Sequence, residues 1–252
     1  MPAQAEKTIG IIGGLGPQAT ADFYHRVICH TPATSDQDHL HVLIDSNPKT
    51  PNRNLAIAGQ GPCPGDTLRQ SALRLQAAGA DFLVMPCNTA HAFKDWIINA
   101  VDIPFIDIID ETVAHIQCLN HQEAHQEKWQ PAHHRNIHIK KVALLATDGC
   151  LQSRLYHNAL EAEGLATLCI DQSKQQHFME LIYAIKATGV TAEIKDQMMA
   201  MAQHLIGFGA QAVIAGCTEV PLVLSQGDLP VPLIDSTDIL AKRCVHYASA
   251  IP

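Results

Sequence analysis

The chain has 252 residues, 47% of them hydrophobic and 17% charged, which is typical of a folded globular protein and argues against extensive disorder. At this length, either one large domain or two small ones could bury a hydrophobic core. The formal net charge of −8 and the lack of a local basic cluster argue against a nucleic-acid-binding surface.

The first half of the chain alternates short apolar runs with segments of helical periodicity. We expect strands at residues 9–12, 40–44, 82–85 and 105–108, and helices at residues 17–31, 65–78 and 110–118. Continuous apolar strands separated by helices indicate a parallel sheet that is covered by helices on both faces.

The second half shows the same alternation. Here we expect strands at 142–146, 166–170, 212–215 and 233–234, and helices at 153–163, 176–188, 191–207 and 237–247. The predicted fold is therefore α/β, with two similar lobes that each contain a roughly four-stranded parallel sheet flanked by helices. We place the N-terminal lobe at residues 1–108, completed by residues 232–252, and the C-terminal lobe at residues 109–231.

Two segments do not fit this alternation. Residues 46–66 are rich in Pro, Gly and Asn and are too long for a plain connector, so they are interpreted as a substrate-covering loop. Residues 118–140 are polar and His-rich, which favours a solvated extension between the lobes. The spacing of His121 and His125 could suit a metal on one helix face, but no acidic or thiol partner has a matching position, and we predict no metal site.

The sequence also bears on where the protein works. Residues 1–7 lack the layout of a secretory signal, and no apolar run is long enough to span a bilayer. Eight cysteines without a compact spacing pattern or a C-x-x-C pair are typical of reduced thiols. We therefore expect a soluble cytoplasmic protein with no membrane partner.

Two cysteines occupy matching places in the two halves of the chain. Residues 79–89 read Gly-Ala-Asp-Phe-Leu-Val-Met-Pro-Cys-Asn-Thr, and residues 209–219 read Gly-Ala-Gln-Ala-Val-Ile-Ala-Gly-Cys-Thr-Glu. A second matching pair follows, Ile-Pro-Phe-Ile-Asp at 103–107 and Val-Pro-Leu-Ile-Asp at 231–235. This internal repeat predicts that the lobes are related by pseudo-twofold symmetry, with the active site between them.

Cys87 and Cys217 each follow a predicted buried strand, and in parallel sheets ligands bind beyond the carboxyl ends of the strands. A single buried cysteine is most often a core residue, but two at equivalent strand ends favour a function. The amides at a strand-to-helix turn stabilise a thiolate and attract carboxylates. A thiolate and a thiol on opposite faces of one carbon can remove a proton from one face and return it to the other.

Several motifs, taken together, resemble one known family over nearly the whole chain. The chain resembles the cofactor-independent Asp/Glu racemase superfamily, most closely its aspartate racemase branch. The motifs are Ile-Ile-Gly-Gly-Leu-Gly-Pro at 11–17, Ser-Asn-Pro at 46–48 with Arg53, Pro-Cys-Asn-Thr-Ala-His at 86–91, Gly-Cys-Thr-Glu at 216–219, Thr-Asp-Gly at 147–149 with Tyr156, and residues 181–189 with Lys186. The resemblance implies racemisation of L- and D-aspartate, with glutamate as a further substrate, in a protein that uses no cofactor and forms a homodimer.

The resemblance also implies roles for particular residues. Cys87 and Cys217 are then the catalytic acid and base, one for each face of Cα. Arg53 and Lys186 match the cations that hold the substrate's carboxylates, and Arg offers a planar fork suited to that task.

Smaller polar residues beside the two cysteines complete the predicted substrate site. Asn88, Thr89 and Thr218, with nearby backbone amides, would bind the α-carboxylate. Glu219 joins this substrate-binding set, and His91 and Glu219 could instead tune the thiols or cap their helices.

Two positions bear on the branch of the family. Glutamate racemases typically have His where this chain has Glu219, which favours the aspartate branch. Cys150 stands where the family usually has Thr, and we interpret it as a tolerated small polar substitution that could affect substrate preference.

Other functions remain open from the sequence. Within the superfamily, hydantoin racemases, maleate isomerases and decarboxylases share the scaffold. A non-catalytic small-molecule-binding protein would keep Arg53 and Lys186 but would not need two thiols. Residues 14–19 also fit a relaxed dinucleotide fingerprint, which would suit an NAD-dependent oxidoreductase, but Asp45 lies farther on than that motif requires.

Overall fold

The computed structural model describes residues 6–123 and 138–249, and the chain divides into two compact units. The first unit comprises residues 1–108 and 237–252, and the second comprises residues 109–236. The second boundary falls later than the expected residue 231, because the strand Leu233–Asp235 is paired within the second sheet.

The first unit contains a four-stranded parallel sheet with the strand order β2-β1-β3-β4. Its strands are β1 (Ile9–Gly13), β2 (Val42–Ser46), β3 (Phe82–Val84) and β4 (Phe105–Ile106). β1 and β3 are buried throughout, as their continuous apolar sequences predict, whereas the edge strand β2 is only partly buried. β2 begins two residues later than expected.

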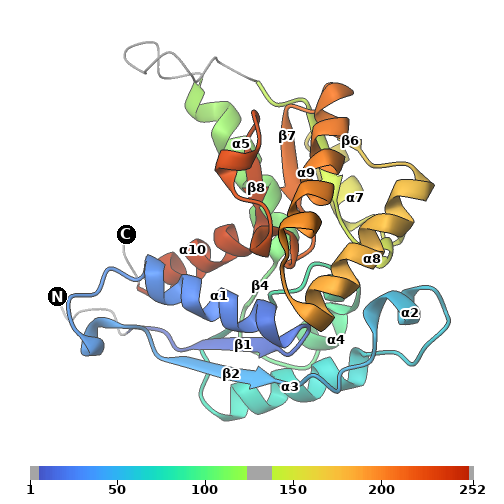
Figure 1. Cartoon of the computed structure of the whole chain (residues 1–252). Coiled ribbons are helices and arrows are strands. Elements are labelled where there is room, and N and C mark those ends of the chain that lie inside the picture. Colours follow the sequence, from blue (N-terminus) through green and yellow to red (C-terminus); the bar gives the residue numbers. More distant parts are fainter. Residues whose placement is uncertain (1–5, 124–137, 250–252) are drawn as a thin grey trace. The chain divides into compact units, whose positions relative to one another are not determined.

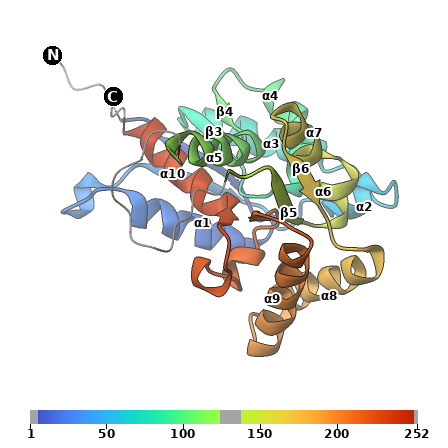
Figure 2. The same cartoon turned by 90° about the horizontal axis from the view of Figure 1, so that it is seen from above.

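Helices cover both faces of this sheet (Figure 1). They are α1 (Pro17–His30), α2 (Arg53–Ile57), α3 (Gly65–Ala77), α4 (Asp95–Ile98) and α10 (Ser236–Ala248). Successive side chains of β3 point to opposite faces: Phe82 meets the ring of Tyr247 in α10 edge-on, while Leu83 packs with Leu68 and Leu75 of α3. Figures 1 and 2 both show α10 beside α1, where His30 lies 2.6 Å from Asp238.

The second unit repeats this topology with the order β6-β5-β7-β8, again entirely parallel. Its strands are β5 (Lys141–Leu145), β6 (Ala166–Leu168), β7 (Ala212–Ala215) and β8 (Leu233–Asp235). In each sheet the first strand of the unit lies between the second and third strands. The predicted α/β fold with two four-stranded parallel sheets is confirmed.

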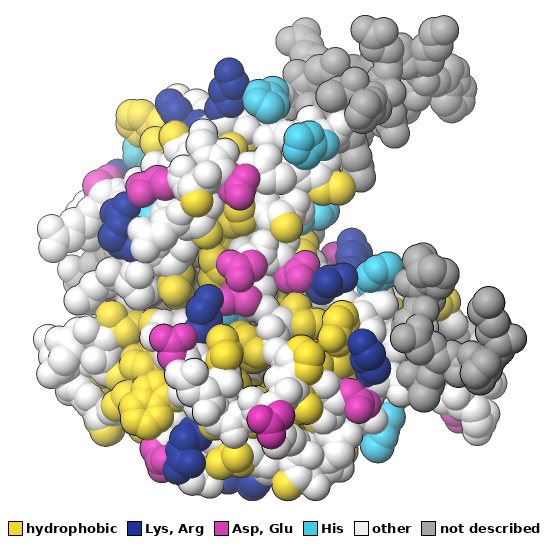
Figure 3. All heavy atoms as spheres, turned by 180° about the vertical axis from the view of Figure 1, so that it is seen from behind, with side chains coloured by type: hydrophobic (Ala, Val, Ile, Leu, Met, Phe, Trp, Pro, Cys, Tyr) yellow, Lys and Arg dark blue, Asp and Glu magenta, His cyan; other side chains and the backbone are white. Residues whose placement is uncertain are grey.

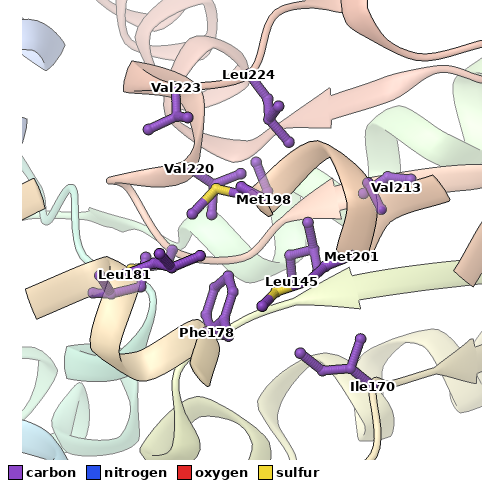
Figure 4. Close-up of a cluster of buried hydrophobic side chains, with 14 of the residues drawn as sticks. Leu145, Ile170, Phe178, Leu181, Met198, Met201, Val213, Val220, Val223 and Leu224 are labelled. Carbon is purple, nitrogen blue, oxygen red and sulfur yellow. The ribbon is translucent and has the colours of Figure 1, made fainter. Parts of the chain in front are cut away.

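The helices of the second unit are α5 (Ile108–Glu123), α6 (Asp148–Gln152), α7 (Leu155–Ala162), α8 (Gln172–Thr188) and α9 (Ala192–Gly207). α8 and α9 pack side by side and bury an apolar core against the sheet (Figure 4). In that core, Phe178 and Leu181 of α8 lie with Met198 and Met201 of α9 beside Leu145 of β5. This packing fixes α8, which carries Lys186, against the strands.

Short 3-10 helices add to both units. They are η1 (Asp36–Asp38), η2 (Thr89–Phe93), η3 (Val220–Leu222) and η4 (Gln226–Asp228). η2 and η3 follow the two matching strands β3 and β7, so they lie next in the chain after Cys87 and Cys217 respectively.

The surface bears on possible partners. Within the described residues, no helix has both the length and the apolarity to cross a membrane. On the described part of the face shown in Figure 3, Lys and Arg side chains are scattered among acidic and apolar ones, and some lie next to one another.

Candidate active site

Cys87 lies just beyond β3, at the carboxyl end of the first sheet. Its side chain is buried, and it packs in the apolar cluster that includes Leu15, Met85 and Ala90. The backbone N–H of Cys87 donates to the Met85 carbonyl oxygen at 2.8 Å, which turns the chain sharply after the strand. Asn88 and Thr89, which follow, are also buried.

His91 fixes the backbone of this turn. Its Nδ1 lies 2.9 Å from the carbonyl oxygen of Cys87, and the backbone N–H of Ile108 donates to its Nε2 at 3.2 Å. A ring that donates through Nδ1 and accepts through Nε2 is the neutral tautomer, so the hydrogen bonds assign that form to His91. The side chain therefore ties the Cys87 turn to the start of α5.

Cys217 lies at the equivalent place in the second unit, after β7. It is buried to the same degree as Cys87, with 6% of each residue exposed, and it also belongs to an apolar cluster. Its carbonyl oxygen accepts from the backbone N–H of Val220 at 2.9 Å. The two thiols thus share burial, a position just after a strand and apolar surroundings, as their matching places in the sequence predict.

The charged surroundings of Cys217 come from Glu219 and Lys186. The Cys217 thiol donates to Oε2 of Glu219 at 2.9 Å, while the Lys186 ammonium of α8 forms an ion pair with Oε1. Burial, and next the Glu219 carboxylate, raise the pKa of Cys217 well above its ordinary value, and Lys186 opposes this increase. This arrangement favours the thiol form of Cys217. Glu219 accepts from a third protein group as well, the Thr218 hydroxyl, which donates to Oε2 at 3.5 Å.

Arg53 is the first residue of α2 and is partly buried. Its Nη2 donates to the carbonyl oxygen of Leu15 at 2.9 Å, and its Nη1 donates to that of Pro51 at 3.1 Å. Its Nε is buried and has no hydrogen-bond partner among the described residues. Because α2 packs against η2, Arg53 belongs to the same neighbourhood as the Cys87 turn.

The glycine-rich loop after β1 has a structural explanation of its own. Gly14 has a φ of +82°, and a Cβ atom there would lie 2.4 Å from the backbone of Asn47. The loop is therefore shaped by the close approach of the segment after β2. Pro17 at the start of α1 also removes one of the backbone N–H groups that a dinucleotide phosphate would use. Both features weaken the reading of this loop as an NAD site.

The predicted site residues fall into two groups, one in each unit. Arg53, Cys87, Asn88 and Thr89 belong to the first unit. In the second unit, the structure brings Lys186, Cys217 and Glu219 into direct contact, with Thr218 between the last two in the chain. The contact between Lys186 and Glu219 had no signal in the sequence, because a helix and a strand end had to be placed first.

Other candidate positions lie elsewhere. A pocket of about 330 Å³ between α3 and α4 is lined by Arg69, Asp95 and Trp96 and includes none of the predicted site residues.

His121 lies in α5, whereas His125, His133 and His134 lie outside the described residues. Within residues 6–123 and 138–249, no group of three or more His, Cys, Asp or Glu side chains could hold a metal ion. Cys150 is fully buried in α6.

Comparisons with known proteins agree with one another. The Asp/Glu/Hydantoin racemase family matches residues 12–244. The chain is 30% identical to the broad specificity amino-acid racemase RacX of Bacillus subtilis (strain 168), over 94% of this chain and 96% of that protein.

Solved structures give the same result. An aspartate racemase from Picrophilus torridus has a TM-score of 0.80 and 26% identity, covering 96% of this chain and 94% of that one. An aspartate racemase homologue from Pyrococcus horikoshii OT3 has a TM-score of 0.73 and 25% identity, covering 96% and 99% respectively. The chain therefore belongs to the Asp/Glu/hydantoin racemase family.

Proposed function

We propose that the protein interconverts L- and D-aspartate by a two-thiol mechanism without pyridoxal phosphate. The observation that carries this proposal is the matched pair of buried cysteines, Cys87 and Cys217, at equivalent strand ends of a repeated fold. The apolar residues that surround Cys87 and Cys217 differ, whereas both units keep a cysteine at this position. Packing alone therefore does not explain why the cysteine is repeated. Membership of a racemase family supports the assignment.

In the proposed reaction, both thiols act on Cα of one bound substrate. One cysteine enters as a thiolate and takes the Cα proton, which makes it a thiol and leaves the electron pair on the substrate. The other enters as a thiol and gives its proton to the opposite face of Cα, which makes it a thiolate. The substrate keeps its composition and only its configuration changes.

The carbanion-like state requires a stabilised α-carboxylate. Asn88, Thr89 and Thr218 are buried beside the two cysteines and are proposed to donate hydrogen bonds to that group. Arg53 is proposed to bind a carboxylate through its buried Nε, which otherwise lacks an acceptor among the described residues. A buried donor without a partner is costly, and a carboxylate oxygen would satisfy it.

Lys186 is the second proposed carboxylate ligand, but its charge is already compensated by Glu219. This pairing favours a second candidate function, racemisation of a broader set of amino acids whose side chains carry no carboxylate. The name of the Bacillus subtilis relative, a broad specificity amino-acid racemase, points the same way. A homodimer remains a prediction from the family resemblance.

The two candidates are separated by one experiment. Protein dialysed against a chelator, with no pyridoxal phosphate or nucleotide added, is incubated with each enantiomer of aspartate, glutamate, alanine, homoserine and lysine in deuterated water. Chiral analysis should show aspartate racemised fastest, with deuterium at Cα of the product. Equal or faster turnover of neutral or basic amino acids would favour broad specificity, and strict dependence on pyridoxal phosphate or a metal would refute the proposal.

A further inference from the structure

The two proposed catalytic thiols differ in one respect despite their matched positions. The second residue after the cysteine is Thr89 in the first unit and Glu219 in the second unit. Both side chains are buried, but only Glu219 carries a charge. An internal repeat that keeps the cysteine and changes this neighbour gives the two thiols different electrostatic surroundings.

The contacts of Glu219 show what this neighbour does. The residue is 3% exposed, and each of its carboxylate oxygens has a protein partner. Oε2 accepts from the Cys217 thiol at 2.9 Å, and Oε1 is paired with the Lys186 ammonium. A thiolate in place of the thiol would lose this hydrogen bond and would face a carboxylate at the same distance.

We propose that Glu219 is a positioning residue that holds Cys217 as a hydrogen-bonded thiol, with Lys186 as the counter-ion that keeps the Glu219 carboxylate ionised. The proposal rests on the two-thiol function above and assigns a starting state to it. Free enzyme that begins a turnover carries the proton on Cys217, and Cys87 acts first as the base. Glu219 is then assigned to the thiol and to Lys186, instead of to the substrate.

The charged groups that act on Cys217 within the described residues come from two elements: Glu219 from the turn after β7, and Lys186 from α8. Their effects on the thiol are opposite. Replacing Glu219 with Gln keeps the size of the side chain, removes the negative charge and leaves the Lys186 cation close to the sulfur. The thiolate of Cys217 should then form at a lower pH.

The test is a residue-resolved titration that needs no activity. Full-length protein labelled with ¹³Cβ-cysteine is titrated by NMR, and the Cys217 signal is identified as the one missing from Cys217→Ser. In the wild type we expect this signal to stay in its thiol position throughout the neutral range. In Glu219→Gln its midpoint should fall by about one pH unit or more. Glu180→Gln is the matched control, because Glu180 is exposed on α8 and pairs with His177.

A second measurement connects the titration to turnover. If the reaction requires Cys217 as a thiol, the alkaline limit of kcat/KM should move to lower pH in Glu219→Gln by the same amount as the NMR midpoint. An unchanged or higher midpoint in folded Glu219→Gln would overturn the proposal. So would a wild-type Cys217 that is already a thiolate at neutral pH, a result that requires no Glu219 variant to fold. A correct titration in a protein without racemase activity would refute the proposed function alone.

Discussion

A buried carboxylate is tolerated only where partners compensate for the loss of water. Glu219 meets that condition through Lys186, whose side chain is 33% exposed and reaches the interior of the second unit with its charged end. The ion pair with Glu219 gives Lys186 a structural role in the second unit, beside its proposed role as a carboxylate ligand.

We predict that Lys186→Met lowers the free energy of unfolding by about 1–3 kcal/mol, because Glu219 is left buried without its counter-ion. The double variant Lys186→Met with Glu219→Gln should recover part of this loss, since no unpaired charge then remains. Urea unfolding followed by circular dichroism measures both values. Strictly additive losses in the double variant would show that the two side chains do not stabilise one another.

At the scale of elements, the loops after β1 and β2 hold each other in place. The backbone N–H of Asn47 donates to the Gly13 carbonyl oxygen at 3.2 Å, and Arg53 crosses from α2 to the Leu15 carbonyl. Gly14 allows this approach, because no side chain fits between it and Asn47. The segment after β2, expected to be a substrate-covering loop, thus includes the helix α2 and is anchored at Arg53.

Gly14→Ala should therefore destabilise the protein by at least about 2 kcal/mol, from the strain of a positive φ together with the clash against Asn47. Gly59→Ala is the matched control: Gly59 also has a positive φ, of 71°, but a Cβ there meets nothing within 4 Å. That control should cost only about 1–2 kcal/mol. The free energy of unfolding of both variants is measured by urea unfolding. Equal losses in the two variants would show that the close approach of Asn47 adds nothing to the cost of the positive φ.

Element boundaries show where sequence patterns reach their limit. β4 was expected to extend to residue 108 but ends at Ile106, because the Ile108 N–H is donated to the His91 ring and α5 begins there. Arg154 takes a left-handed conformation with a φ of 54°, which separates α6 from α7, and no glycine or proline marks this break. α2, α4 and α6 are each shorter than the window in which helical periodicity can be recognised.

At the scale of the whole molecule, the internal repeat made both sheets predictable. The apolar strands and the paired Gly-Ala and Pro-x-Ile-Asp runs occur in the same order in both halves, and the two sheets have the same strand order. The cysteines could be singled out because the repeat preserves them. The contact of Lys186 with Glu219 could not be predicted from the sequence. It depends on how α8 packs near the turn after β7, and the order of charged residues in a sequence does not show which of them come together in space.

The central claim is that each of the two repeated thiols serves one face of Cα. The most direct test is Cα–deuterium exchange with L- and D-aspartate in wild type, Cys87→Ser and Cys217→Ser, because serine is a far poorer base at neutral pH. Cys29→Ser and Cys118→Ser, which alter exposed thiols, serve as controls and should racemise normally. Both catalytic-site variants should lose racemisation while folded, and any remaining exchange should favour opposite enantiomers in the two. Racemisation that survives in folded Cys87→Ser or Cys217→Ser would contradict the two-thiol account.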